Sequence, residues 1–408
     1  MRMWKSTDSG NTWTGVDTSN DPVVDDQVAI AQFDAIQDPS DPTKIIFAWV
    51  APRTRVDNLD GSSELGEYKI SIFDMTASTW GTPSTGGPPS WYSFGSSAYN
   101  AEQYSGAEFN IAKDTADGSI WLSYISLVDA ATALPINGIS LLMQRPSIIQ
   151  LDSGGSWGSP VLMMAEPTVP ANYRSNGIAI GDASRVHVIA TQYTMVDTPT
   201  VPVDNDWMRV FHQSYSGTLG AVQLIEEQLF ADSDFSNTAS PLVTRQVSGT
   251  TELLFGYGYT PHSTPPSDRD PDDVEEHIAR AISATNPTWT IQTLPGINNT
   301  GAFLDGGFCW CTPVTHGTRL IAYTNFFEDA TGDQQVRVCE YVSGAWVTAF
   351  NVYATALQYP YGDLALCNLV NDGAAIGVVI AASFANGHYY YESTASGGGG
   401  VRVMNYVF

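Results

Sequence analysis

The sequence has little charge, few lysines, few cysteines and no long hydrophobic run. Charged residues make up 15% of the 408 residues, well below the roughly 25% of an average domain, which argues against a helical bundle or a coiled coil. The longest apolar stretch, residues 374–385, is too short for a membrane helix of about 20 residues. The polar N-terminus does not resemble a signal peptide. The chain is therefore expected to be globular, without membrane insertion.

The few cysteines exclude a disulfide scaffold. All four lie in the last quarter of the chain, at Cys309, Cys311, Cys339 and Cys367. Four cysteines in a chain of this length do not form the dense framework of a small secreted domain. Buried free thiols are expected, with a disulfide or a metal site as the alternatives.

The scarcity of basic residues leaves a strongly acidic chain. Seventeen lysines and arginines stand against 43 aspartates and glutamates, which gives a net charge of −26. Such a chain repels nucleic acid and anionic membranes, so neither is expected as a partner. Excess aspartate with only four lysines is typical of proteins that function in high salt, where screening relieves carboxylate repulsion. An ordinary acidic extracellular or phage protein is the other interpretation.

Two interleaved series of β-rich segments repeat about every 65 residues. The first series is an apolar strand that follows a short polar turn. It occurs at residues 44–50, 119–125, 185–190, 252–257, 319–323 and 376–381. The second series is a strand, a turn of small residues and a large apolar residue. That residue is Trp13, Trp80, Trp157, Leu219, Trp289 and Trp346 in turn.

Six repeats of about four short strands predict an all-β fold, a six-bladed β-propeller, in which each blade buries its faces against its neighbours. Seven blades is the alternative. The predicted single domain covers residues 1–408, with approximate blades at 21–85, 103–165, 174–227, 236–296, 300–354 and 358–408 plus 1–20. Residues 401–407 copy the third strand at 336–342. The N-terminal and C-terminal strands are therefore expected to close the ring together.

One turn of the second series carries a recognisable motif. Its fixed positions are Ser6, Asp8, Gly10, Thr12 and Trp13, and a degenerate copy has Asp152, Gly154 and Trp157. This pattern resembles the Asp box, or BNR repeat, of sialidase-like β-propellers. The aspartate is expected to accept backbone N–H bonds, the glycine to take the left-handed conformation, and the tryptophan to pack between sheets. The resemblance implies an architecture rather than an activity, because such boxes lie away from catalytic faces.

The long connections between strands are expected to emerge on one face of the propeller, where function usually lies. They are rich in aspartate and in aromatic residues, a combination that can stack on sugar rings and accept their hydroxyls. The candidate ligand-binding residues are Trp91, Tyr92, Tyr173, Arg174, Trp207, Tyr259, Tyr359 and Tyr361. The alternative is that the rings pack the loops and the acids solvate them.

No catalytic residue is assigned from the sequence. A sialidase would need an arginine cluster for the carboxylate of its substrate, to which Arg174 and Arg245 could contribute. The Phe/Tyr-Arg-Ile-Pro segment that opens sialidase domains is absent. His187 alternates within a strand and is interpreted as a core or channel residue.

An acidic run suggests a metal site. Asp268, Asp270 and Asp272 alternate as in a calcium loop, but the glycine of an EF-hand turn is missing. Ca²⁺ is therefore a candidate ligand, a solvated acidic loop is the alternative, and no cofactor is expected to be required.

The sequence favours a non-enzymatic structural or recognition propeller, expected in a virion or extracellular. As a phage or archaeal-virus surface or tail component, it would bind a cell-surface glycan or a neighbouring virion protein, as part of a homo- or hetero-oligomer. A glycoside hydrolase of sialidase-like architecture and an intracellular protein–protein scaffold are the alternatives. The step to a virion rests on analogy of fold.

Overall fold

The fold of the chain, seen in a computed structural model, is all-β. The structure describes residues 4–5, 12, 14–15, 33–52, 64–92, 109–127, 134–136, 139–141, 144–164, 171–194, 206–230, 242–259, 275–295, 310–316, 319–328, 333–354, 364–372, 375–384 and 400–407. In this part of the chain the helical structure is one short 3₁₀ turn, Asp182–Ser184. No helix in these ranges is long and apolar enough to cross a membrane.

The chain divides into two compact units. The first comprises Met1–Met3 and Val16–Ser233, and the second comprises Trp4–Gly15 and Asp234–Phe408. Each unit consists of antiparallel sheets in which consecutive strands pair, so the expectation of successive four-stranded units agrees with the local structure. The six-bladed ring and its single-domain closure stay predictions.

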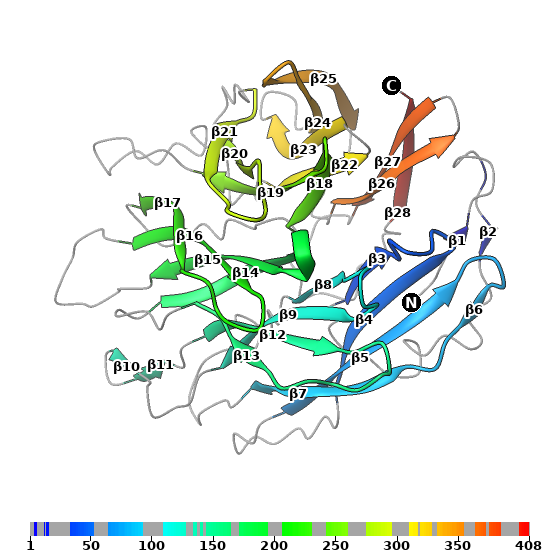
Figure 1. Cartoon of the computed structure of the whole chain (residues 1–408). Helices are drawn as coiled ribbons and strands as arrows, with labels where there is room; N and C mark the ends of the chain where they lie inside the picture. The colour runs from blue at the N-terminus through cyan, green and yellow to red at the C-terminus, as the bar shows by residue number, and fades with distance from the viewer. Residues whose placement is uncertain are drawn as a thin grey trace. The chain divides into compact units, whose positions relative to one another are not determined.

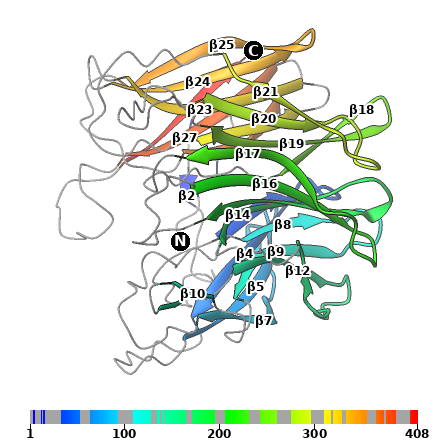
Figure 2. The ribbon, with the colours of Figure 1, turned by 90° about the vertical axis from the view of Figure 1, so that its left-hand side faces the viewer.

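The first unit contains a five-stranded sheet, here sheet 1, and an eight-stranded sheet that consists of two meanders, here sheets 2 and 3 (Figure 1). Sheet 1 has the order β3–β4–β5–β6, with β7 also paired to β5 along a neighbouring stretch (Figure 2). Its strands are β3 (Phe33–Gln37), β4 (Lys44–Pro52), β5 (Glu64–Asp74), β6 (Thr79–Trp80) and β7 (Ser84–Tyr92). Sheet 2 contains β8 (Phe109–Lys113), β9 (Ile120–Leu127), β12 (Gln144–Leu151) and β13 (Val161–Leu162). A separate hairpin, β10 (Leu134–Ile136) and β11 (Ile139–Leu141), lies in the connection from β9 to β12.

Sheet 3 follows sheet 2 and shares little main-chain pairing with it. Its strands are β14 (Ala171–Ile180), β15 (Val186–Thr194), β16 (Asp206–Tyr215) and β17 (Gln223–Phe230). Among the described residues, one parallel residue pair, Gln144 with Asn172, joins β12 to β14. The sheets of this unit are therefore held together mainly by their side chains.

Sheet 2 is buried on both faces. On one face Ile149 and Leu122 pack with Ile46 of sheet 1 in one core cluster. On the other face Ile148 packs with Val188 of sheet 3 in a second cluster. Successive residues of a strand point to opposite faces, so a strand buried on both sides must be apolar at consecutive positions. This explains why the first repeat series consists of continuous apolar runs instead of alternating ones.

The second unit contains three further sheets and a hairpin. Sheet 4 consists of β18 (Val243–Val247), β19 (Thr250–Tyr259), β20 (Glu275–Ala281) and β21 (Trp289–Thr293). Sheet 5 consists of β22 (Trp310–His316), β23 (Arg319–Glu328), β24 (Asp333–Val342) and β25 (Ala345–Ala354). Leu254 and Ile278 of sheet 4 share a core cluster with Leu320 and Cys339 of sheet 5. Cys339 is a buried free thiol, as expected.

The last sheet differs from its expected form. Sheet 6 has three strands, β26 (Leu364–Asp372), β27 (Ala375–Phe384) and β28 (Gly400–Val407). The N-terminal strands β1 (Trp4–Lys5) and β2 (Thr14–Gly15) pair with each other as a two-stranded hairpin. This hairpin belongs to the same unit as β28, but in the described residues it does not extend sheet 6. Completion of that sheet by the N-terminus therefore stays a prediction.

The second repeat series marks a turn that closes in the same way in three sheets. The glycine after the large apolar residue donates its N–H to a carbonyl of the preceding strand. These bonds join Gly81 to Ile72, Gly158 to Gln150 and Gly220 to Ser214, each at 2.8 Å. Trp80 packs against Phe73 and Phe47 at 5.0 and 4.9 Å between ring centroids. The periodic tryptophan thus anchors the outer strand of its sheet.

The turn at residues 150–158 has part of the geometry expected of its motif. Asp152 Oδ1 accepts the N–H of Ser156 at 2.7 Å, and Trp157 packs against the core cluster between sheets 1 and 2. The left-handed residue is Gly155, with φ of +86°. The expectation for Gly154 was wrong, because the turn places its tightest bend one residue later. Of the first copy, Ser6, Asp8, Gly10 and Trp13 lie outside the described residues, and Thr12 is exposed.

Candidate functional site

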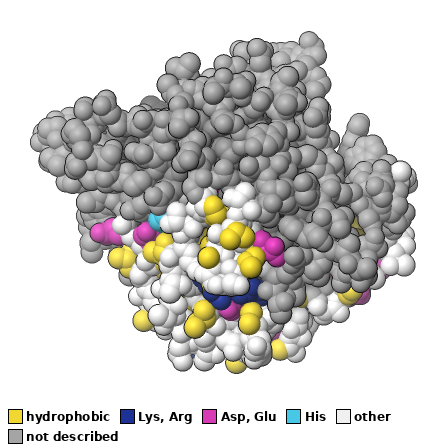
Figure 3. All heavy atoms as spheres, turned by 90° about the horizontal axis from the view of Figure 1, so that it is seen from above, with side chains coloured by type: hydrophobic (Ala, Val, Ile, Leu, Met, Phe, Trp, Pro, Cys, Tyr) yellow, Lys and Arg dark blue, Asp and Glu magenta, His cyan; other side chains and the backbone are white. Residues whose placement is uncertain are grey.

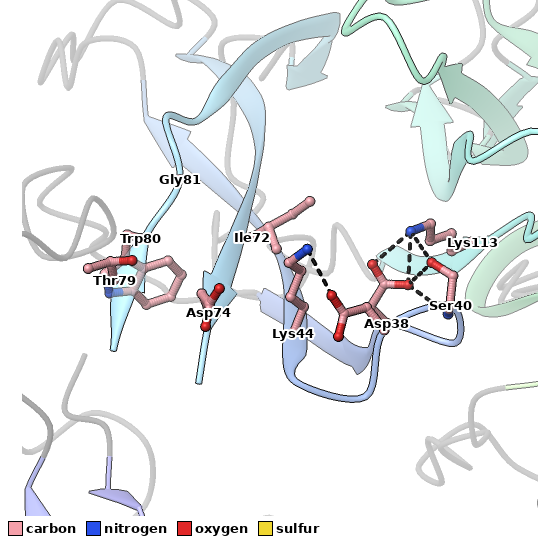
Figure 4. Close-up of a pocket in the computed structure, with 10 residues that line it drawn as sticks. Asp38, Ser40, Lys44, Ile72, Asp74, Thr79, Trp80, Gly81 and Lys113 are labelled. Carbon is pink, nitrogen blue, oxygen red and sulfur yellow. Dashed lines mark hydrogen bonds and ion pairs between the residues drawn. The ribbon is translucent and has the colours of Figure 1, made fainter. Parts of the chain in front are cut away.

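An open hollow of about 590 Å³ lies at one end of sheet 1. Its walls come from the turn between β3 and β4, the hairpin between β5 and β6, and the end of β8 in sheet 2. The lining residues are Asp38, Ser40, Asp41, Lys44, Ile72, Asp74, Thr79, Trp80, Gly81 and Lys113. Figure 4 shows Thr79 and Trp80 at one end and Ser40 and Lys113 at the other. Three carboxylates, two ammonium groups and one indole therefore meet in one concave surface.

A buried ion pair between Asp38 and Lys113 forms one wall and joins sheets 1 and 2. The Asp38 side chain is 3% exposed, and Lys113 Nζ donates to its Oδ1 and Oδ2 at 2.8 and 2.7 Å. Lys113 Nζ also donates to Ser40 Oγ at 2.8 Å. Burial by itself raises the pKa of Asp38, but the hydrogen bonds from Lys113 and Ser40 outweigh it and lower that pKa. Asp38 is therefore ionised at neutral pH.

A second, more exposed ion pair stands beside the first. Lys44 Nζ contacts Asp41 Oδ2 at 2.8 Å, with the two side chains 39% and 35% exposed. Asp41 Oδ1 also accepts the N–H and hydroxyl of Thr43 at 3.1 and 2.7 Å. The hydrogen bond from Lys44, followed by those from Thr43, lowers the pKa of Asp41 to about 2. Both lysines of the hollow thus already have carboxylate partners.

The opposite wall contains polar atoms that make no hydrogen bond to other described residues. Asp74 Oδ1 accepts the N–H groups of Thr76 and Ala77 at 2.8 and 2.9 Å. No described residue bonds its other oxygen, Oδ2, and Thr79 is exposed beside it. The buried Nε1 of Trp80 has no hydrogen-bond partner. Trp157 Nε1 also lacks one, whereas Trp346 Nε1 donates to Gln292 Oε1 at 3.3 Å. The Trp80 indole contributes to the hollow through its ring.

The hollow lies at the opposite end of the strands from the expected site. Its walls are the short turns after β3 and β5, whereas the long connections leave the other ends of β4, β5 and β7. Trp91 and Tyr92 end β7 at that other end. Trp207 is the second residue of β16 and Tyr259 ends β19, and both lie at strand ends that face long connections. Tyr359 and Tyr361 lie outside the described residues. Short turns were not expected to form a binding surface.

One residue proposed for ligand binding, Tyr173, has structural surroundings instead. Tyr173 is 2% exposed and packs in the core between sheets 2 and 3, with its ring 6.4 Å from that of Phe211. The prediction of ligand binding for Tyr173 does not fit this burial, because its ring has no open face. Arg174 follows it on β14, at a register shift between β14 and β15.

Arg245 is part of a buried ionic cluster in the second unit. Its Nε and Nη2 donate to Oε2 of Glu252, the latter contact at 2.5 Å, and both side chains are at most 6% exposed. Arg280 Nη2 donates to Glu252 Oε1 at 2.6 Å, and Arg280 Nη1 donates to Tyr341 Oη of sheet 5 at 2.8 Å. A guanidinium held in this way does not face a substrate carboxylate, so the contribution of Arg245 to an arginine cluster is not supported.

Two buried histidines form a chain in sheet 3. His187 Nδ1 lies 3.0 Å from His212 Nε2, and His212 Nδ1 lies 2.9 Å from Gln223 Oε1. The amide oxygen requires a proton on His212 Nδ1, so the proton between the rings belongs to His187. Burial lowers the pKa of His187 to about 3 and that of His212 to about 4. His187 is a core residue, as its alternation within a strand indicated.

The described ranges contain no group of three or more histidine, cysteine, aspartate or glutamate side chains that could hold a metal ion. Asp268, Asp270 and Asp272 lie outside these ranges. The Ca²⁺ site therefore stays a prediction. On the described part of one face, basic side chains lie directly beside acidic ones (Figure 3).

Sequence reasoning missed the hollow because its residues are ordinary turn residues. The pattern Asp38-Pro-Ser-Asp-Pro-Thr-Lys44 predicts a tight hairpin whose charged side chains are solvated. One signal was available. Two of the four lysines of this acidic chain, Lys44 and Lys113, lie at equivalent turns of successive repeats. Scarce lysines beside equivalent turns, one at the start of β4 and one at the end of β8, indicate specific carboxylate partners.

No model of a known protein family matches the chain, and no curated protein is similar to it in sequence. Among solved structures, an α-L-arabinofuranosidase, Arb93A from Fusarium graminearum, is similar with a TM-score of 0.47 and 10% identity, over 92% of each chain. An α-L-arabinanase of Penicillium chrysogenum matches with a TM-score of 0.43 and 10% identity, over 86% of this chain and 88% of that one. A Trypanosoma rangeli sialidase matches with a TM-score of 0.44 and 9% identity, over 94% of this chain and 57% of that one. These proteins are glycoside hydrolases, and likeness at this level assigns no activity or substrate to this chain.

Proposed function

We propose that this protein is a carbohydrate-binding β-propeller and that the hollow of sheet 1 holds a sugar. The observation that supports this is the combination of groups in one concave surface. The ring of Trp80 offers an apolar wall, the unused Oδ2 of Asp74 accepts a hydroxyl, and Thr79 donates or accepts beside it. Sugars present apolar C–H faces and rings of hydroxyl groups, which aromatic rings and carboxylates bind together.

Removal of Asp74 or Thr79 tests this proposal without disturbing the core. Asp74→Asn is expected to weaken glycan binding roughly tenfold, because hydrogen bonds to a charged acceptor are the stronger ones. Thr79→Val is expected to weaken it several-fold. Binding is measured by titration calorimetry after a glycan array has identified a ligand.

Matched controls come from the same turn in other sheets. Asp152→Asn changes an aspartate that bonds the backbone of its own turn in sheet 2. Thr218→Val changes the exposed threonine before Leu219 in sheet 3. Neither residue lines the hollow. Equal losses in the control and test variants, or no glycan bound at all, would contradict the proposal.

A second candidate function is glycoside hydrolysis, favoured by Asp34. This half-buried residue lies on β3, toward the ends of the strands from which the long connections leave. Burial raises its pKa to about 6, although the N–H groups of Ile111 and Ala35 lower it in part. A carboxyl group that still holds its proton in part near pH 6 meets the requirement for a general acid in mildly acidic solution.

Hydrolysis is tested on aryl arabinofuranosides, galactosides and sialosides. If Asp34 is the acid, kcat/KM falls as the pH rises through about 6, and Asp34→Asn removes activity while Asp117→Asn keeps it. If the protein binds glycans but hydrolyses none of these substrates, the result contradicts hydrolysis and supports recognition as the function. The virion or extracellular location, and partners among virion proteins, stay predictions about where such binding is used.

A further inference from the structure

We infer that the hollow of sheet 1 selects neutral glycans and rejects acidic ones. This inference rests on the proposed function and specifies its ligand class. The lysines of the hollow are already paired with carboxylates of the protein. The hollow therefore offers hydrogen-bond acceptors to a ligand, but no cation that lacks a carboxylate partner.

The hollow carries a net negative formal charge. Asp38, Asp41 and Asp74 line the hollow against Lys44 and Lys113, so its formal charge is three negative against two positive, or −1. No arginine is among the lining residues. The whole chain adds a net charge of −26, which repels anions over distances up to the Debye length.

All three N–H donors of the Lys113 ammonium group are engaged within the wall of the hollow. An ammonium group has three donors, and Lys113 Nζ makes three contacts, with Oδ1 and Oδ2 of Asp38 and Oγ of Ser40, at 2.7 to 2.8 Å. Its side chain is 12% exposed. It therefore has no donor for a ligand carboxylate, and its charge is neutralised within the wall.

Lys44 is surrounded by three carboxylates of the protein. Its ammonium is paired with Asp41 at 2.8 Å, and it is also attracted by Asp74 and Asp38. A ligand carboxylate would have to compete with these fixed carboxylates for one exposed lysine. The hydroxyl groups of a neutral sugar instead meet the acceptors that remain, above all Asp74 Oδ2.

The experiment compares sugars that differ only in charge. Galactobiose and digalacturonic acid have the same size and ring geometry, but the acid carries a carboxylate in place of each C6 hydroxymethyl group. Their binding is measured by calorimetry on the full chain at 20 mM and 300 mM NaCl, alongside further neutral and acidic pairs on a glycan array. Neutral members are expected to bind roughly tenfold more tightly at low salt, with a smaller difference at high salt.

A charge variant locates the effect. Asp74→Asn makes the hollow neutral and is expected to reduce the preference for neutral over acidic sugars, whereas Asp152→Asn leaves it unchanged. Acidic sugars binding as tightly as their neutral partners would overturn the inference while the proposed function stands. Absence of binding by every glycan would overturn the proposed function itself.

Discussion

At the scale of single residues, the molecule places its scarce cations against buried carboxylates. Lys113 neutralises Asp38 between sheets 1 and 2, and Arg245 and Arg280 both pair with Glu252 in sheet 4. A buried charge that loses its partner keeps the full cost of its desolvation. Stability is therefore concentrated in a few side chains whose removal leaves an uncompensated charge.

Replacing Lys113 tests this directly. Lys113→Met leaves the buried Asp38 carboxylate without its cation and is expected to lower the free energy of unfolding by about 3 kcal/mol. Lys44→Met breaks the exposed pair with Asp41 and is expected to cost less than about 1 kcal/mol. Urea denaturation at pH 7 measures both effects. Equal losses in the two variants would contradict the expectation that burial makes the Asp38–Lys113 pair the more important one.

The histidine chain predicts a dependence on pH. Both histidines have folded pKa values below the ordinary 6.5, at about 3 and 4, so between these values and 6.5 the unfolded chain binds protons that the folded chain does not. Stability is therefore lost as the pH falls from about 6.5 toward 4, by up to ~1.4 kcal/mol per pH unit for each histidine.

The raised pKa of Asp34 acts in the opposite direction between pH 4 and 6, since there the folded chain binds the extra proton. A variant separates the two effects. His212→Gln is expected to flatten the acid side of a plot of melting temperature against pH. An unchanged slope in that variant would show that the histidines do not titrate in this range.

At the scale of elements, the repeated hairpins were the most predictable part of the fold. All six apolar runs of the first series are second strands of their sheets, and residues 401–407 form a third strand, as their copy in sheet 5 does. Apolar runs and turn residues determine the structure of the segment in which they occur, so their repetition along the chain allows the strands to be predicted from the sequence. The site was not readable in this way, because Asp38 and Lys113 are 75 residues apart and meet only through the packing of two sheets.

The closing glycine of the repeated turn gives an element-scale prediction. A Cβ on Gly220 would lie 2.6 Å from Ser214 Oγ and 3.3 Å from Ser214 O, whereas a Cβ on Gly158 would lie 3.6 Å from Gln150 O. Gly220→Ala is expected to lower the stability of the fold by about 1 kcal/mol, and Gly158→Ala to leave it nearly unchanged. Thermal melts of both variants, and of Ser214→Ala combined with Gly220→Ala, measure this. A double variant no more stable than Gly220→Ala would place the strain on the backbone carbonyl.

At the scale of the whole molecule, net charge is the dominant property. With a net charge of −26, the carboxylates of the folded chain repel one another. Added salt screens this repulsion and is expected to raise the melting temperature up to about 0.5 M NaCl, where the Debye length is already short. A further steep rise toward molar salt would support adaptation to high salt. A flat response throughout would show that the carboxylates are too widely spaced for their repulsion to affect folding. Melting curves by calorimetry across this range measure the effect.

Among the described residues, one backbone pair, Gln144 with Asn172, joins sheets 2 and 3, and this has a consequence for how such a chain changes length. Each four-stranded meander pairs its own strands, and it meets its neighbours mainly through side chains, which include the bonds from Ile111 to Asp34 and from Met164 to Gln213. A duplicated or deleted meander would therefore break little main-chain pairing, and it would mainly require that two side-chain surfaces match. Gene segments encoding about 65 residues are in this sense the natural unit of insertion, and a tandem copy of sheet 2 would be accepted more readily than a copy of half of it.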